Sequence, residues 1–90
     1  MDNKMELVLY TRPTCSDCQD AKVYLAEENI PYEHKDVGAD PSLEEDMKKI
    51  SGAKVVPVFA FYNKSLFGKK LTHHFIGFER NRDEILRLLG

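Results

Sequence analysis

Cys15 and Cys18 are the only two cysteines of this 90-residue chain, and two residues separate them. They follow a short apolar run, Leu7–Tyr10, at a point where a strand can pass into a helix. Thiols at this spacing can close into a disulfide and reopen. In a reducing compartment, a C-x-x-C pair beside a strand–helix pattern is typical of a dithiol redox motif rather than a structural staple. The sequence therefore predicts thiol–disulfide chemistry.

A helix start would make one of the two thiols reactive. If Cys15 lies at the N-terminus of the first helix, unpaired backbone N–H groups and the helix dipole stabilise its thiolate, lowering the thiol pKa from about 8.5 towards neutrality. Cys15 is then the nucleophile that attacks a substrate disulfide. Cys18, one turn further and less exposed, resolves the mixed disulfide by exchange. Asp17 has two opposed effects, because a carboxylate suits a helix start but repels a neighbouring thiolate.

Length and charge limit the other classes of function. Ninety residues predict a single domain spanning residues 1–90. A net charge of −2 with scattered basic residues argues against nucleic acid as a partner. No apolar stretch approaches the roughly 20 residues of a membrane span, and the first residues lack the apolar core of a secretion signal. We therefore expect a cytoplasmic monomer with no membrane partner, in a compartment where structural disulfides are rare.

Hydrophobic periodicity predicts the elements that position the cysteines. Strands are expected at residues 5–10, 32–37, 54–62 and 71–76, with a turn at 63–70. Helices are expected from Cys18 to about Asn29, from Asp40 to Gly52, and from Asn81, where Glu84 completes a capping box. This order predicts an α/β fold in which a four-stranded mixed sheet carries helices on both faces. The first two strands should be parallel and the last two should form a hairpin.

Pro57 interrupts a strongly strand-like run and is the second informative residue. Because proline cannot donate to a strand ladder, it indicates an edge feature or a special peptide bond. A cis Val56–Pro57 bond would turn the backbone of Val56 outward, where it can pair with an extended substrate. Only about 5–6% of X–Pro bonds in folded proteins are cis, so the residues alone favour trans.

Taken together, these segments resemble the glutaredoxin branch of the thioredoxin fold. The resemblance rests on a strand ending at Tyr10, the segment 11–22 with both cysteines and Ala21–Lys22, the Val55-Val56-Pro57 run, and Gly77. It implies the minimal thioredoxin fold, β-α-β-α-β-β-α, with a cis proline facing the thiols. It also implies reduction of protein disulfides or glutathionylated thiols, with glutathione as co-substrate and no bound cofactor.

The same resemblance assigns residues around the dithiol. Arg12 holds the place of the family's basic residue, three positions before the nucleophile, and is expected to attract an anionic substrate or the thiolate. The residues expected to bind substrate or glutathione are Arg12, Thr14, Val56, Pro57, Gly77 and Phe78. Phe78 is expected to be exposed near the thiols and to contact partners.

The sequence departs from the family pattern in three places, two of which concern the electron donor and one the length of a hairpin. The dithiol is C-S-D-C instead of C-P-Y-C, and Gly77-Phe78-Glu79 replaces the family's glycine pair. Gly77-Phe78 is similar to glutaredoxin-like redoxins that serve ribonucleotide reductase and are recharged by thioredoxin reductase, so this reductase is an alternative partner. The span from Pro57 to Gly77 is longer than usual, which predicts a long hairpin around residues 63–70.

Other roles for the cysteines and for Arg12 stay open. The cysteines alone can form half of a zinc site, although His34, His73 and His74 are not spaced as its second half. They can also hold an iron–sulfur cluster between two subunits, or dock onto a partner without turnover. Arg12 can be a solvated surface charge instead of a carboxylate-binding group.

Overall fold

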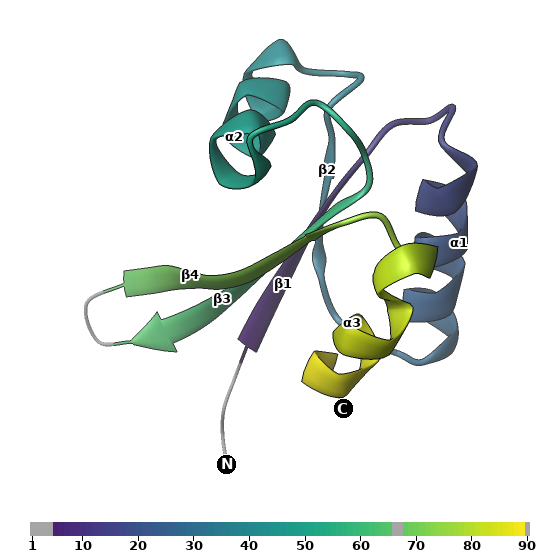
Figure 1. The fold of residues 1–90 in the computed structure, drawn as a ribbon, viewed down its shortest axis with the longest axis vertical. Coiled ribbons are helices and arrows are strands. Elements are labelled where there is room, and N and C mark those ends of the chain that lie inside the picture. Colours follow the sequence, from purple (N-terminus) through teal and green to yellow (C-terminus); the bar gives the residue numbers. More distant parts are fainter. Residues whose placement is uncertain (1–4, 66–67, 90) are drawn as a thin grey trace.

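A computed structural model describes residues 5–65 and 68–89, and these form a four-stranded mixed sheet in the order β2-β1-β3-β4. The strands are β1 Met5–Thr11, β2 Glu33–Asp36, β3 Val58–Ser65 and β4 Gly68–Ile76. The helices are α1 Ser16–Glu27, α2 Pro41–Ser51 and α3 Arg82–Leu89, with a 3₁₀ turn η1 at Glu79–Asn81. β2 runs parallel to β1, whereas β3 is antiparallel to β1 and β4 is antiparallel to β3. Figure 1 shows α1 and α3 on one face of the sheet and α2 on the other, so the predicted mixed sheet with helices on both faces is confirmed.

Strand β1 lies between β2 and β3 in the sheet, and both of its faces are buried. Successive side chains of a strand point to opposite faces, so Leu7 and Leu9 pack towards α1 and α3, whereas Val8 and Tyr10 pack towards α2. The first layer also includes Ala21, Leu25, Phe59, Phe61, Phe78 and Ile85, and the second includes Val37, Met47, Val58 and Ala60. The segment that carries the cysteines therefore begins at the end of a strand that is fixed on both sides.

Capping residues, a proline and a glycine determine where the helices α1 and α2 begin or end. The Asp40 carboxylate accepts the backbone N–H of Ser42 at 2.9 Å, and Pro41 occupies the first turn of α2. Gly52 ends that helix in the left-handed conformation at φ 78°. Helix α1 begins at Ser16, two residues before the predicted start, because Cys15 itself is the N-cap.

Strands β3 and β4 form the predicted long hairpin, but the extent of its turn differs from the prediction. A turn was predicted over residues 63–70, but β3 continues to Ser65 and β4 starts at Gly68, with these two residues paired across the strands. The prediction was wrong because the antiparallel ladder satisfies the backbone of this polar stretch without an apolar pattern. Residues 66–67 of the predicted turn lie outside the described residues. Strand β3 also begins at Val58 rather than at residue 54, directly after the proline that lacks an N–H.

Phe78 is buried, and the prediction that it is exposed was wrong. Its side chain is 1% exposed and packs between Tyr24 and Phe59, each with a ring centroid 5.8 Å away. An aromatic side chain at the end of the sheet gains more from this apolar layer than from water. The side chain of Asn81, predicted to begin the last helix, donates to the carbonyl oxygens of Ile76 and Gly77 at 2.7 and 3.1 Å.

Replacing the buried ring tests this packing. We expect Phe78→Ala to lower the free energy of unfolding by about 3–5 kcal/mol, because it leaves a cavity between α1 and the sheet. Urea denaturation measures the loss. The control is Val55→Ala at a side chain that is 54% exposed, where we expect a change within about 0.5 kcal/mol. Equal, small effects of both changes would contradict the buried position of Phe78.

Candidate functional site

Cys15 caps the first turn of α1 with its sulfur. The backbone N–H of Cys18 donates to Cys15 Sγ at 3.1 Å, and Cys15 has the extended backbone typical of an N-cap. The two cysteines form a disulfide whose Cα atoms lie 5.2 Å apart. Cys18 is 0% exposed, whereas Cys15 is partly exposed. A reagent in solvent can therefore reach Cys15 but not Cys18.

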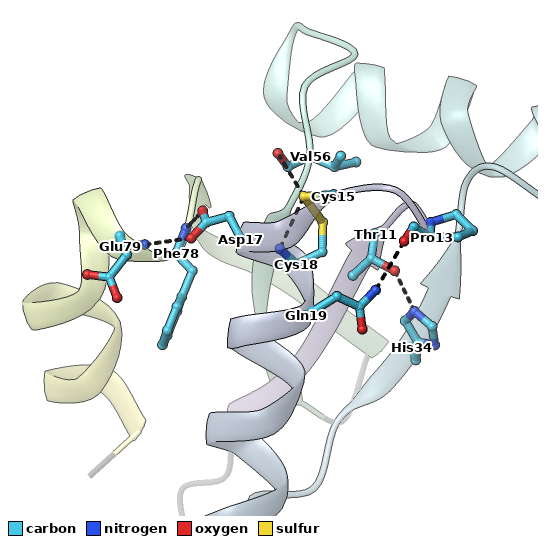
Figure 2. Close-up of a disulfide and its surroundings, with 10 residues drawn as sticks. All are labelled: Thr11, Pro13, Cys15, Asp17, Cys18, Gln19, His34, Val56, Phe78 and Glu79. Atoms are coloured by element: carbon cyan, nitrogen blue, oxygen red, sulfur yellow. Dashed lines mark hydrogen bonds between the residues drawn. A yellow bond between two sulfur atoms is a disulfide. The ribbon is translucent and has the colours of Figure 1, made fainter.

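The loop before β3 lies against the exposed sulfur. The Val56–Pro57 peptide bond is cis, and the carbonyl oxygen of Val56 is 3.9 Å from Cys15 Sγ (Figure 2). The backbone N–H of Gly77 donates to the carbonyl oxygen of the buried Pro57 at 2.8 Å. Three residues predicted for the site, Val56, Pro57 and Gly77, thus form one connected stretch beside the disulfide.

Gly77 is required by its backbone conformation. Its φ is +98°, a value that side-chain-bearing residues rarely adopt. A Cβ atom at this position would also lie 2.7 Å from Cδ and 2.9 Å from Cγ of Arg80. The glycine therefore lets the chain turn from β4 into η1 immediately beside the Pro57 loop.

Arg12 is paired with a carboxylate of the protein itself. Its guanidinium donates to the Glu44 side chain on α2, and the two side chains are 31% and 23% exposed. The hydrogen bond from Arg12 holds the pKa of Glu44 below its ordinary value. The resemblance implied that Arg12 attracts an anionic substrate or the thiolate, whereas the contact in the structure is with Glu44. Sequence reasoning missed Glu44, since only the fold brings α2 next to the loop after β1.

Asp17, inside the dithiol motif, binds the loop that follows Gly77. Its carboxylate accepts the backbone N–H groups of Phe78 at 2.7 Å and Glu79 at 3.3 Å (Figure 2). Asp17 was expected to have two opposed effects, one on the helix start and one on the thiolate, and no binding partner was predicted for it. Phe78 therefore contributes its backbone N–H to this part of the site, because its ring is buried in the core.

The loop between β1 and α1 is held by bonds on its other side. The amide of Gln19 donates to the carbonyl oxygen of Pro13 at 3.4 Å, and the Thr11 hydroxyl lies 2.6 Å from Nε2 of His34 (Figure 2). Burial of the ring, followed by the positive charge of Lys22, lowers the pKa of His34. Thr14, predicted to contact substrate, is exposed directly before Cys15.

Within residues 5–65 and 68–89, no cluster of three or more His, Cys, Asp or Glu side chains is arranged to hold a metal ion. Over the same residues, no helix has the length and apolar character needed to cross a membrane.

Comparison with known proteins covers most of the chain. The family model described as Glutaredoxin matches residues 7–65. The global transcriptional regulator Spx 1 of Bacillus cereus is 39% identical over 44 residues, which is 49% of this chain and 34% of that protein. The regulator Spx of Listeria innocua is 34% identical over 44 residues, with the same two shares. The match thus spans about a third of the length of these curated relatives.

Solved structures match over nearly the whole length. Plasmodium falciparum thioredoxin aligns with TM-score 0.74 and 20% identity over 98% of this chain and 72% of that one. The Archaeoglobus fulgidus glutaredoxin aligns with TM-score 0.68 and 24% identity over 93% of this chain and 84% of that one. The Brucella melitensis glutaredoxin aligns with TM-score 0.57 and 27% identity over 93% of this chain and 87% of that one. These likenesses confirm the minimal thioredoxin fold. The Glutaredoxin model matches more than half of the chain, which therefore belongs to the glutaredoxin family.

Proposed function

We propose that the protein is a dithiol–disulfide oxidoreductase in which Cys15 is the nucleophile and Cys18 the resolving thiol. The observation that carries the proposal is the hydrogen bond from the Cys18 N–H to the partly exposed sulfur of Cys15 at the first turn of α1. An amide aimed at sulfur favours the thiolate over the thiol, and the positive end of the helix dipole adds to the effect. The burial of Cys18 reserves the first attack for Cys15.

The proposed reaction balances over two exchanges. The Cys15 thiolate attacks one sulfur of a substrate disulfide, forms a mixed disulfide and releases the other sulfur as a thiolate. The Cys18 sulfur, after losing its proton to solvent, attacks Cys15 Sγ and releases the second substrate thiolate. The substrate gains two electrons, and the protein is left with the Cys15–Cys18 disulfide seen in the structure.

The Val56–Pro57 loop is proposed to align the substrate. The carbonyl oxygen of Val56 lies beside Cys15 Sγ. A backbone carbonyl in this position can accept an N–H from an extended peptide that carries the disulfide. Protein disulfides and glutathione mixed disulfides are therefore the proposed substrates, in a reducing compartment such as the cytoplasm.

A second candidate function is redox sensing within a transcriptional regulator. It is favoured by the 44-residue match to Spx proteins, whose printed name is global transcriptional regulator. In this case the same dithiol would switch between reduced and oxidised states without repeated turnover. Catalytic reduction of a disulfide in excess over the protein would support the enzyme. A single stoichiometric oxidation, with no turnover in the presence of either reducing system described below, would support the sensor.

The cysteine roles can be separated by substitution. We expect Cys15→Ser to abolish disulfide reduction, because no exposed thiol remains to attack. We expect Cys18→Ser to accumulate a mixed disulfide at Cys15, because the resolving thiol is missing. Mass spectrometry of each variant after exposure to a disulfide, together with a reduction assay, measures both outcomes. Wild-type activity of Cys15→Ser would refute the mechanism.

Activation of Cys15 can be measured directly. In the Cys18→Ser variant, whose serine retains the backbone N–H at position 18, we expect Cys15 to react with iodoacetamide at mildly acidic pH roughly tenfold faster than N-acetylcysteine. The rate constant is obtained from the loss of free thiol with time. A rate equal to that of the small thiol would show that the helix start does not activate the sulfur.

The electron donor is proposed to be either glutathione or thioredoxin reductase. We expect NADPH to be consumed in a coupled assay with one of these systems, glutathione with its reductase or thioredoxin reductase alone, when a disulfide substrate is present. The Cys15→Ser variant is the control for protein-independent turnover. A lack of NADPH oxidation above this control in both systems would contradict the enzymatic proposal.

A further inference from the structure

Two sets of hydrogen-bond donors near the dithiol that could receive a substrate carboxylate are already bound by carboxylates of the protein. The Arg12 guanidinium is bound by Glu44, from α2. The two backbone N–H groups of Phe78 and Glu79 are bound by Asp17, from α1. Both carboxylates come from segments distant in sequence from the groups they bind.

We propose that Asp17 and Glu44 are specificity-determining residues that make Cys15 react preferentially with disulfides that carry no carboxylate. This inference rests on the proposed function, since it concerns the attack of Cys15 on a substrate disulfide. An anionic disulfide can gain these donors only by displacing a charged internal partner, and it approaches Asp17 at a cost in electrostatic repulsion. A neutral disulfide meets neither obstacle. Of the two substrate classes proposed above, protein disulfides without nearby carboxylates are therefore favoured, and glutathione disulfides, which carry carboxylates, should react more slowly.

The pairing of Arg12 matters more than the net charge of this surface. A guanidinium binds a carboxylate through charge-assisted hydrogen bonds, which are about twice as strong as neutral ones. The other charged groups near the Gly77 turn partly offset one another. Arg80 lies against Gly77, and Arg82 pairs with Glu79 at 3.1 Å. Discrimination should therefore follow from which donors are occupied, not from a uniformly negative surface.

The test measures one turnover with two disulfides of similar size. Reduced protein, freed of reductant, is mixed with neutral bis(2-hydroxyethyl) disulfide or with dianionic 3,3′-dithiodipropionate. The rate constant for loss of the dithiol is measured for each. The ratio of the anionic to the neutral rate constant, compared between variants, cancels the intrinsic reactivity of the two reagents.

Removing either carboxylate should raise this ratio. We expect Glu44→Gln and Asp17→Asn each to raise it about threefold, the size of one charge interaction several ångström across water. The neutral rate constant should change little in Glu44→Gln, whereas in Asp17→Asn both rate constants shift, because the carboxylate beside the Cys15 thiolate is lost, and the ratio is the readout. The gain should shrink at high ionic strength, because salt screens exposed charges. Loss of fold or of loop position would lower both rate constants and would not show this salt dependence.

Matched variants separate local pairing from overall charge. Asp20→Asn on α1 and Glu45→Gln on α2 remove the same charge at exposed positions of the same helices, and we expect them to leave the ratio nearly unchanged. Adding Arg12→Gln to Glu44→Gln should cancel the gain, because the freed guanidinium is then absent.

The outcomes distinguish this inference from the proposed function. An unchanged ratio in both Glu44→Gln and Asp17→Asn, in protein that still reduces the neutral disulfide, would overturn the inference while leaving the oxidoreductase intact. Equal gains in the control variants would overturn it as well, because charge alone would explain them. Failure of the wild-type dithiol to react with either disulfide would overturn the proposed function, and the inference with it.

Discussion

The hydrogen bond between the Cys18 N–H and Cys15 Sγ is the contact on which the site depends. It is possible because α1 begins one residue after Cys15, so that the sulfur acts as the side-chain cap of a helix. The same helix start buries Cys18 against the sheet and leaves Cys15 partly exposed. A single local structure therefore aims an amide at the accessible sulfur and keeps the other sulfur away from solvent.

The rest of the fold keeps this helix start in place. Strand β1 is packed on both faces, so the loop that follows it leaves the sheet at a fixed point. The Pro57 loop and the Gly77 turn come from β3 and β4, and the Gly77–Pro57 hydrogen bond joins them on the other side of the disulfide. Asp17 then links the helix start to the Gly77 turn, so three segments distant in sequence hold one another.

Local patterns in the sequence were sufficient for most of the fold. Alternating and helical periodicities placed the sheet and helices, and the C-x-x-C spacing identified the chemistry. These local patterns were insufficient where tertiary contacts determine the extent of a strand or the burial of a side chain. The polar residues of the β3–β4 hairpin carry no apolar pattern, yet the strand ladder extends through them. Phe78 was predicted to be exposed because nothing local shows the apolar space between Tyr24 and Phe59.

The partners of Arg12 and Asp17 could not be predicted for a related reason. Each charged residue bonds to a group far away in the chain, Glu44 in one case and the backbone at Phe78 and Glu79 in the other. Side-chain type indicates which bonds are possible, but only the packing of α2 and the Gly77 turn determines which are made. Of the residues expected to touch substrate, Arg12 binds Glu44 and the backbone N–H of Phe78 binds Asp17, so both are bound by carboxylates of the protein itself.

The outer edge of the sheet has a consequence for behaviour at high concentration. Among the described strands, β4 pairs only with β3, so one side of its main chain is open to strand addition. Its exposed positions include Lys69, Lys70, His73 and His74. Cationic and polar side chains along an edge oppose the edge-to-edge association that leads to β-aggregates. The polar hairpin thus protects the folded chain from assembling into intermolecular sheets.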